Sequence, residues 1–449
     1  MVIPHFIFIF ASTFKNKFKM ITKENGLRYA KLIHVSVDNG LTSQSNKVYI
    51  MEEQTDGKIK CQYGRVGKDL VTVYKQCHEW DKVLRSKTNA RKGYEDVTDL
   101  ISEDASSSGS TTTTTTKTVN IKDNQVKRLF DDLMAFANKS IQRNYKVTQD
   151  NVTQAQIDAA QDVLTKATSL AKIGIDVKEI NTLLMKLYTI IPREMKDVRD
   201  YLVEAANDND DLNKIKDFLA NEQDTLDTMA GQVKLITQQK GQIADVSDNT
   251  KSDEITLLGQ MGLEVSVETD TKQLELINRL LGSTKDRAKK IYKCVNKSTQ
   301  AVFDKHYGKA RFKDRKLFWH GSRNENWFNI IQSGLLIRPS GAVHTGSMFG
   351  DGIYFANKAQ KSLGYSSVRG SYWAGGSANK GFLALYDVYH GKQKKILHHD
   401  SSCYSLSKSV MDREGYESVF AQGGADLRND EFIVYDAKQC TIAYLVEFQ

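Results

Sequence analysis

The chain of 449 residues has little of what marks several simple structural classes. With three prolines and 29 glycines, it is neither collagen-like nor proline-rich. Its few cysteines lack the CxxC or CxH spacing of a zinc site and do not suggest a disulfide framework; they are Cys61, Cys77, Cys294, Cys403 and Cys440. Reduced thiols fit a cytosolic or nuclear protein better than a secreted one.

Long apolar runs are also missing. The apolar stretch 2–14 is too short for a transmembrane helix, which needs roughly 20 residues. Lys15, Lys17 and Lys19 follow this stretch, whereas a secretory signal carries its basic residues first. Residues 1–24 are therefore an unassigned leader, with Met20 as an alternative first residue, and we do not expect secretion.

Common catalytic motifs are absent as well. The sequence contains no GxxxxGKS/T phosphate loop, no GxSxG elbow, no HExxH zinc motif and no GxGxxG between a strand and a helix. The composition, with 26% charged and 40% hydrophobic residues, is that of an ordinary globular protein. Its length predicts two to four domains.

The net charge of +8 is unevenly distributed, because both ends of the chain are basic and the middle is acidic. This pattern indicates separate modules. The basic ends suit either contact with a polyanion or simple solvation of surface charge.

Residues 25–101 alternate apolar and polar positions in short runs. KVYIME, KIKCQYGRVG and DLVTVYKQ predict strands, with a hairpin turn at Asp56-Gly57 between the first two. A helix is expected around His78–Arg91. The next segment, 102–119, is rich in Ser and Thr and has almost nothing to bury, which predicts a flexible linker.

Residues 120–247 place apolar residues at three- and four-residue spacing, which predicts an all-helical domain. Thr153, Asp210 and Asp211 are candidate N-caps, and Pro192 should end a helix. The segment contains no cluster of His or Cys, so we expect no catalysis there.

Residues 248–449 alternate short apolar runs with glycine-rich turns, and the runs predict strands at KLFWHGS, GDGIYFA, GFLALYDVY, EFIVYD and TIAYLVEF. A helix is expected at WFNIIQSG and another after Asn357. This predicts an α+β domain with a mostly antiparallel sheet. Three polar residues stand out on the predicted strands: His320, Tyr354 and Glu431. Taken singly, His320 suits a hydrogen-bonded core histidine and Glu431 a solvated strand end. Together they indicate a functional site.

These segments resemble a known family. HGSR, GDGIYFA, KSLGY and NDEFIVYD are similar to the His–Tyr–Glu signature of the poly(ADP-ribose) polymerase catalytic domain. TQAQIDAAQDVLTKA and LYTIIPRE resemble that family's helical regulatory domain, and CQYGRVGK resembles its WGR domain. The resemblance implies a multidomain α+β protein with a small β-rich WGR-like domain at 25–101, an all-α helical regulatory domain at 120–247 and a mostly antiparallel ADP-ribosyltransferase domain at 248–449.

The resemblance also implies that NAD is the substrate and that no metal is required. The nicotinamide would lie between the rings of Tyr354 and Tyr365, because flat aromatic faces suit a flat heterocycle. Gly321 and Ser362 would bind its carboxamide, with Ser322 beside them as a further cofactor-binding residue. A glycine lets the ligand approach the backbone closely.

Four residues would be catalytic by the same resemblance: His320, Tyr354, Glu431 and Lys361. His320 would bind the adenosine ribose and orient the NAD molecule. Glu431 would stabilise the positive charge that develops at the ribose carbon when nicotinamide leaves, and would polarise the acceptor hydroxyl. Lys361 would orient Glu431 or the acceptor.

The candidate DNA-binding residues are Tyr63, Gly64, Arg65 and Lys68. Tyr63 replaces the family's tryptophan and keeps much of its flat packing surface, so we expect the fold to survive this departure. A basic cluster would add phosphate contacts; it comprises Lys82, Arg85, Lys87, Arg91 and Lys92. Alternatively, Arg65 packs within its own module and the cluster is a solvated helix face.

The function implied by the resemblance is NAD-dependent poly-ADP-ribosylation of protein acceptors, including the chain itself, stimulated by DNA strand breaks during DNA repair. An accessory factor that completes the acceptor site is a further possible partner. The protein would be nuclear if eukaryotic and otherwise cytoplasmic. Two alternatives remain, a mono-ADP-ribosyltransferase and an inactive DNA-end-binding scaffold.

One further departure, Leu336, stands where some relatives have a basic residue near the adenosine, so the affinity for NAD should differ.

Overall fold

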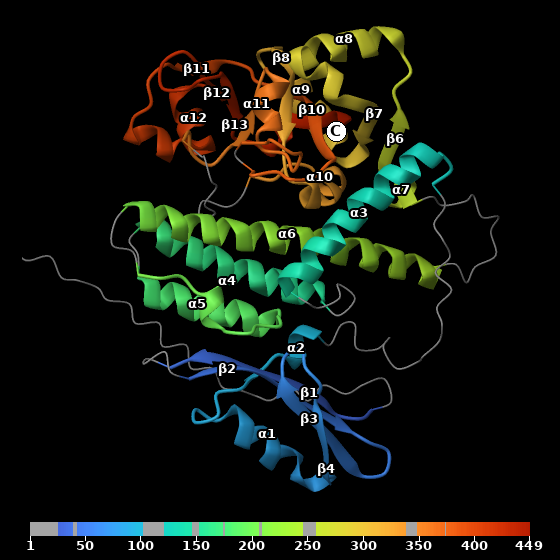
Figure 1. Cartoon of the computed structure of the whole chain (residues 1–449), viewed down its shortest axis with the longest axis vertical. Helices are drawn as coiled ribbons and strands as arrows, with labels where there is room; N and C mark the ends of the chain where they lie inside the picture. Colours follow the sequence, from blue (N-terminus) through green and yellow to red (C-terminus); the bar gives the residue numbers. More distant parts are fainter. Residues whose placement is uncertain are drawn as a thin grey trace, which may run out of the picture.

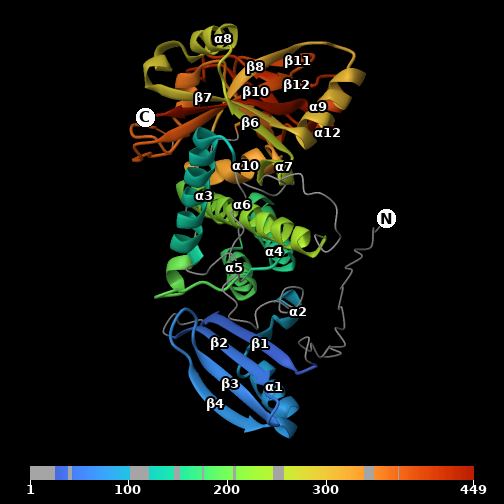
Figure 2. The ribbon, with the colours of Figure 1, turned by 90° about the vertical axis from the view of Figure 1, so that its right-hand side faces the viewer.

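A computed structural model of the protein describes residues 26–38, 43–101, 121–145, 152–173, 176–205, 209–245, 257–337, 348–372 and 374–449. The predicted leader and the predicted linker lie outside these residues. The described chain forms an N-terminal sheet (26–101), a helical bundle (121–245) and a C-terminal unit (257–449), stacked in this order along the long axis (Figures 1 and 2). No helix of the described chain is both long and apolar enough to cross a membrane.

The N-terminal sheet pairs its strands in the order β4-β3-β2-β1-β5. The predicted hairpin is confirmed, since β2 (Gln44–Glu53) and β3 (Lys58–Arg65) pair antiparallel across the turn at Asp56 and Gly57. The predicted helix is α1 (Trp80–Thr88), whose buried Trp80 packs on one face of the sheet. The strand predicted at DLVTVYKQ is β4 (Val71–Gln76). The unit also contains β1 (Tyr29–Val37), β5 (Glu95–Asp96) and α2 (Thr98–Ile101).

The helical bundle consists of α3 (Asn124–Tyr145), α4 (Gln154–Ile173), α5 (Val177–Ile190) and α6 (Asn209–Asp245). Thr153 caps α4 as predicted: its hydroxyl accepts from Gln156 N–H, and the Gln156 side chain accepts from Thr153 N–H, both at 3.1 Å. The N-cap prediction for Asp210 and Asp211 is wrong, because α6 begins at Asn209 and both residues lie in its first turn.

The C-terminal unit contains two sheets, with strand orders β6-β7-β14-β10-β8 and β11-β12-β13-β9. Their described pairings are antiparallel except for β11 with β12, which confirms the predicted mostly antiparallel sheet. The strands are β6 (Leu263–Val267), β7 (Ala288–Asn296), β8 (Arg315–Gly321), β9 (Ile353–Phe355), β10 (Gly381–Tyr389), β11 (Gln393–Ile396), β12 (Ser418–Ala421), β13 (Glu431–Val434) and β14 (Cys440–Phe448).

Short helices cover these sheets. The two helices expected from the sequence are α10 (Trp327–Ser333) and α11 (Ala359–Leu363). Others were not predicted, because their apolar stripes are short and interrupted; they are α7 (Leu257–Gln260), α8 (Thr271–Leu281), α9 (Lys297–Lys309) and α12 (Lys408–Glu414).

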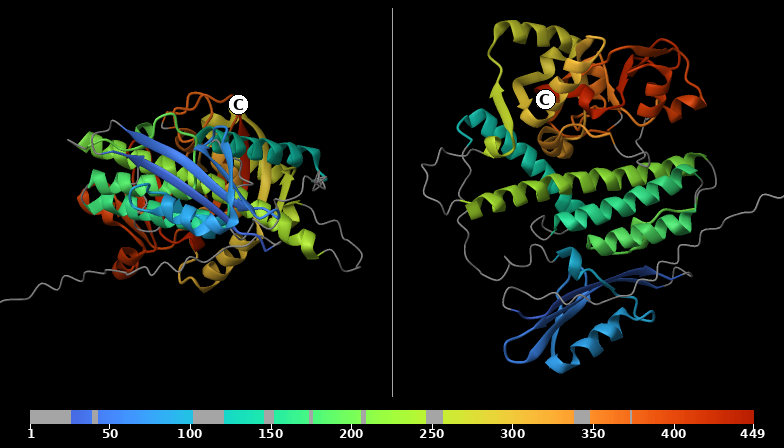
Figure 3. Two further views of the ribbon diagram at one scale, coloured as in Figure 1. Left: turned by 90° about the horizontal axis from the view of Figure 1, so that it is seen from below. Right: turned by 180° about the vertical axis from the view of Figure 1, so that it is seen from behind.

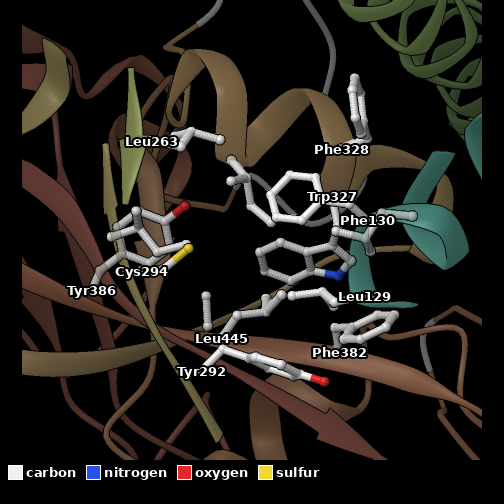
Figure 4. Close-up of a cluster of buried hydrophobic side chains, with 14 of the residues drawn as sticks. Leu129, Phe130, Leu263, Tyr292, Cys294, Trp327, Phe328, Phe382, Tyr386 and Leu445 are labelled. Atoms are coloured by element: carbon white, nitrogen blue, oxygen red, sulfur yellow. The ribbon is translucent and has the colours of Figure 1, made fainter. Parts of the chain in front are cut away.

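Helix α3 shares a hydrophobic core with the C-terminal unit. Leu129 and Phe130 of α3 are fully buried in one cluster with Trp327 of α10 and Phe382 of β10 (Figure 4). Helix α3, which precedes the predicted boundary near residue 248, therefore completes the core of the C-terminal unit.

The N-terminal sheet packs on the bundle through a connecting strap, residues 193–198, which follows α5. The side-chain amide of Asn46 in β2 donates to the backbone oxygen of Arg193 at 2.9 Å. Arg193 in turn forms a buried two-point ion pair with Glu222 of α6, at 3.1 and 2.7 Å. The strap thus joins the sheet to α6. Seen from behind, the bundle lies between the N-terminal sheet and the C-terminal unit (Figure 3).

Candidate active site

A cavity of about 290 Å³ lies between the C-terminal unit and α6. This volume is just below the ~300–1,000 Å³ usual for ligand pockets. The lining contains all the residues predicted to be catalytic or cofactor-binding: His320, Gly321, Ser322, Tyr354, Lys361, Ser362, Tyr365 and Glu431. Residues 111 positions apart in the sequence therefore come together in one concave site.

His320 lies near the end of β8 and is held in one orientation. Its Nδ1 is 3.0 Å from the backbone oxygen of Tyr354. Because a carbonyl oxygen only accepts hydrogen bonds, Nδ1 carries the proton and Nε2 of the neutral ring is an acceptor. Burial lowers the pKa of His320 below 6.5, against the opposing effect of the hydrogen bond to Tyr354. The ring therefore offers an acceptor of fixed direction.

Tyr354 is fixed at both ends. Its backbone oxygen binds His320, and its hydroxyl donates to Gly350 O at 2.8 Å while accepting from Phe349 N–H at 2.9 Å. Burial raises the pKa of Tyr354 well above 10 and that of Tyr365 to about 12. Both phenols thus stay neutral near pH 7, and both line the cavity. The cavity therefore has the aromatic surface that a flat heterocycle requires.

Packing requires a glycine at position 321, which the sequence alone did not show. A Cβ at this position would lie 2.0 Å from the backbone oxygen of Ser362 in α11. Glycine is therefore needed to let α11 approach the end of β8. Ser362 is almost fully buried, and the hydroxyl of Ser322 accepts from the Asn326 amide at 3.1 Å.

Glu431 is the first residue of β13, and its carboxylate pairs with the ammonium group of Lys361 from α11. Each of the two side chains is only 12% exposed, so Glu431 is not a solvated strand end. Burial lowers the pKa of Lys361, whereas the charges of Glu431 and Asp430 oppose this change. The site holds a carboxylate in a place from which most water is excluded, where its charge acts strongly.

Helix α6 contributes residues to the cavity that sequence reasoning missed. Asp224, Asp227 and Thr228 are part of its lining. The sequence of α6 alone gave no signal, because acidic residues on a helix are ordinary solvent-facing positions. Only the tertiary packing brings two carboxylates into the site.

A close contact between α6 and α10 holds this arrangement. The Asn329 amide donates to the backbone oxygen of Asp227 at 2.9 Å. Directly beside it, a Cβ at Gly231 would lie 2.8 Å from the Cβ of Asn329. We call these three residues the α6–α10 latch. Glycine at position 231 is what allows the helices to come this close.

The candidate DNA-binding residues are placed differently from one another. Tyr63 is 36% exposed and stacks on Tyr49 with ring centroids 5.7 Å apart. The Arg65 guanidinium donates to the backbone oxygens of Met195 and Lys196, at 3.1 and 2.6 Å. The alternative that Arg65 packs within its own module does not describe these contacts, since both carbonyls belong to the strap.

Further candidates also make contacts within the protein. Lys68 pairs with Glu194 of the strap at 2.6 Å. Gly64 leaves little room, because a Cβ there would lie 3.0 Å from Leu70 Cδ2. Nζ of Lys87 lies 4.1 Å from the ring centre of Tyr49. The remaining cluster residues are exposed; they are Lys82, Arg85, Arg91 and Lys92.

Two smaller expectations concern the edge of the cavity and metals. Leu336 lines the cavity and is 59% exposed, so an apolar side chain stands at that edge. In the described part of the chain, no group of three or more His, Cys, Asp or Glu residues is arranged to hold a metal ion. That the reaction needs no metal stays a prediction.

Comparison with known proteins identifies relatives of the part of the chain that carries this site. Residues 271–449 match the family described as the poly(ADP-ribose) polymerase catalytic domain. A putative poly [ADP-ribose] polymerase-like protein, 100L of Invertebrate iridescent virus 6, is 31% identical over 160 residues, which are 35% of this chain and 83% of the viral protein. Protein 101L of the same virus is 31% identical over 218 residues, covering 49% of this chain and 83% of that protein.

A longer match extends beyond the C-terminal unit. Poly [ADP-ribose] polymerase of Drosophila melanogaster is 25% identical over 363 residues, which are 73% of this chain. The match covers only 34% of the Drosophila protein. The similarity thus includes part of the chain before residue 271, although it spans about a third of that relative.

Proposed function

The chain belongs to the poly(ADP-ribose) polymerase family and transfers ADP-ribose from NAD, and we propose that it builds poly(ADP-ribose) on protein acceptors in response to DNA strand breaks. The observation that carries this proposal is the pairing of Glu431 with Lys361 in a cavity that also holds His320 and two tyrosines. Acceptors would include the chain itself.

The cavity fits NAD through residues whose directions are already set. His320 would accept from a hydroxyl of the adenosine ribose through Nε2, since Nδ1–H is bound to Tyr354 O. The rings of Tyr354 and Tyr365 would enclose the nicotinamide. The backbone of Gly321 and the Ser362 hydroxyl would bind the carboxamide, next to Ser322.

Glu431 would act on the departing nicotinamide and on the acceptor. Cleavage of the nicotinamide–ribose bond develops positive charge at the ribose carbon. A preorganised carboxylate on the ribose 2′-hydroxyl stabilises that charge and can also accept the acceptor's proton. Lys361 holds the carboxylate in place. We favour poly- over mono-transfer, because elongation has to polarise a sugar hydroxyl and Glu431 supplies the carboxylate.

The helical bundle would restrain the unstimulated enzyme. Asp224 and Asp227 place two carboxylates in the cavity, where the diphosphate of NAD would meet like charge. The small volume of the cavity is consistent with a partly closed site. Activation would then shift the population toward a state in which α6 has moved or loosened.

The N-terminal sheet is the proposed reader of DNA breaks, as a WGR-like domain at 25–101, with the helical regulatory domain at 120–247 and the transferase domain at 248–449. Tyr63 and the exposed basic residues of α1 and the segment after it would contact the DNA. Arg65 and Lys68 bind the strap, and the strap binds α6 through Arg193 and Glu222. This chain of contacts supports transmission from the reader to the cavity. Such a function would place the protein in the nucleus of a eukaryotic cell.

The test is transfer of label from NAD, with and without nicked DNA, resolved on a denaturing gel. The proposal expects a ladder or smear of modified protein that grows at least several-fold on addition of DNA. A single discrete shift without a ladder would indicate mono-transfer. Equal transfer with and without DNA would remove the proposed regulation while leaving the transferase activity intact.

A further inference from the structure

Asp430, which directly precedes Glu431, is held on two sides by neighbouring segments. Its Oδ1 accepts from Gly423 N–H at 2.9 Å, and its Oδ2 accepts from the Asn357 amide at 2.9 Å. Its backbone oxygen lies 3.4 Å from Nζ of Lys361. One residue therefore ties the loop before β13 to the segment between β9 and α11.

These contacts matter because of where Glu431 stands. It pairs with Ala421, the last residue of β12, so the strand ladder ends at this position. Beyond it, residues 422–430 form a loop with two consecutive glycines, Gly423 and Gly424, whose backbone is intrinsically free. The ladder fixes Glu431 from one side only, and the Asp430 carboxylate fixes it from the other.

The residue before Asp430, Asn429, also contacts the segment between β9 and α11. Nζ of Lys358 lies 3.4 Å from Oδ1 of Asn429. Three consecutive residues, 429–431, thus contact three residues of the short segment 357–361. That segment leads from Tyr354 to Ser362 and Tyr365, so the contacts connect the nicotinamide side of the cavity to the carboxylate side.

We propose that Asp430 is a positioning residue for ADP-ribosyl transfer, acting by holding the Glu431 carboxylate at the reacting atoms. This inference rests on the role proposed for Glu431. Asp430 does not itself line the cavity, so its removal should leave NAD binding largely intact. Displacing a catalytic group by about 1 Å can cost on the order of 10² in rate.

The experiment measures kcat and KM for NAD on the full chain with nicked DNA. Asp430→Ala should lower kcat by about tenfold or more and change KM for NAD by less than about threefold. Asp430→Asn is the matched conservative variant. Its oxygen can still accept from Gly423 N–H. Once the Asn357 side-chain amide turns over, the new amide can donate to Asn357 Oδ1, which has no hydrogen-bond partner among the described residues. It should retain most of the wild-type kcat.

Two further variants separate positioning from folding. Asp412→Ala, at an exposed ion pair on α12, should leave kcat unchanged. Combining Asp430→Ala with Glu431→Gln should be no slower than Glu431→Gln alone, because a residue that acts through Glu431 has no effect once Glu431 is disabled.

Several outcomes would overturn the inference. One is a wild-type kcat in Asp430→Ala, whether or not the midpoint of urea unfolding changes. Another is a loss in Asp430→Ala that adds fully to that of Glu431→Gln. Wild-type transfer by Glu431→Gln itself would instead contradict the proposed function, so the two failures are distinguishable.

Discussion

At the scale of single residues, the site depends on a few side chains that hydrogen bonds or an ion pair hold in one conformation. The hydrogen bond from Nδ1 of His320 to Tyr354 O selects one tautomer, and the ion pair with Lys361 selects one position for the Glu431 carboxylate. Preorganised groups of this kind need no rearrangement when charge develops in the transition state. Changing one of them should therefore affect rate more than folding.

We expect Glu431→Gln to keep NAD binding but to lose transfer and elongation by on the order of 10²-fold or more. The amide is nearly isosteric with the carboxylate, yet it can neither offset positive charge nor accept a proton as a base. Product length and initial rate on a denaturing gel measure this, with NAD binding checked separately by calorimetry. Long polymer at the wild-type rate would show that Glu431 has another role.

His320 should make stability depend on pH in a defined direction. Burial lowers its pKa below 6.5, so between the folded value and 6.5 the unfolded chain binds a proton that the folded chain does not. The free energy of unfolding therefore rises with pH through this window and falls as the pH drops below 6.5. Urea unfolding of the wild type and of His320→Gln, compared between about pH 5 and 7.5, tests this.

The comparison should show a weaker acid dependence in His320→Gln than in the wild type. His78→Gln, at an exposed histidine of the N-terminal unit, is the control for the substitution itself. If the His320 variant retains the full slope below pH 6.5, the acid sensitivity arises from other groups.

At the scale of secondary-structure elements, the bundle has two different relationships with the C-terminal unit. Helix α3 is built into its core through Leu129 and Phe130. Helix α6 instead meets it at polar contacts around the cavity, above all at the α6–α10 latch of Asn329, Asp227 and Gly231. Deleting the whole segment 120–247 would strip the core as well as the restraint, so point changes at the latch test the restraint better.

Asn329→Ala should raise transfer in the absence of DNA by about fivefold, since a net hydrogen bond contributes ~1 kcal/mol to the closed arrangement. Gly231→Ala should act in the same direction, because its Cβ would meet that of Asn329. Initial rates without DNA measure both variants. Asp217→Ala, exposed on the same helix, is the control. No increase in either latch variant would argue against a restraining α6.

At the scale of the whole molecule, the bundle lies between the N-terminal sheet and the C-terminal unit (Figures 1 and 3). The strap 193–198 contacts the sheet on one side and α6 on the other. A contact made by Arg65 can thus serve DNA binding, transmission or both. The two roles differ in what they change. A phosphate contact changes affinity and its salt dependence, whereas transmission changes only the response to bound DNA.

Arg65→Ala should reduce stimulation by nicked DNA and leave DNA-independent transfer intact. Because its guanidinium already binds Met195 and Lys196 carbonyls, we expect the affinity for DNA to fall less than the stimulation. Fluorescence anisotropy at two salt concentrations, run beside the transfer assay, separates the two effects. Lys82→Ala, at an exposed lysine of α1, is the comparison for a pure phosphate contact. Stimulation that survives Arg65→Ala at both salt concentrations would end this role for the sheet.

The local pattern of the sequence was enough to predict the strands β8, β9, β10, β13 and β14, the helices of the bundle and the motif residues His320, Tyr354 and Glu431. Apolar periodicity and turn residues act over a few positions, so they can be read without knowing what lies opposite. Even the errors at this level, such as the N-cap at Asp210, concern single positions at element ends.

The tertiary structure alone decided which faces meet. It placed α3 in the core of the C-terminal unit, Asp224 and Asp227 at the cavity, and Arg65 against the strap. It also showed Asp430 beside Asn357, two residues 73 positions apart. Such contacts depend on the packing of surfaces that are distant in the chain, and a polar residue carries the same local pattern whether it faces water or a neighbouring element.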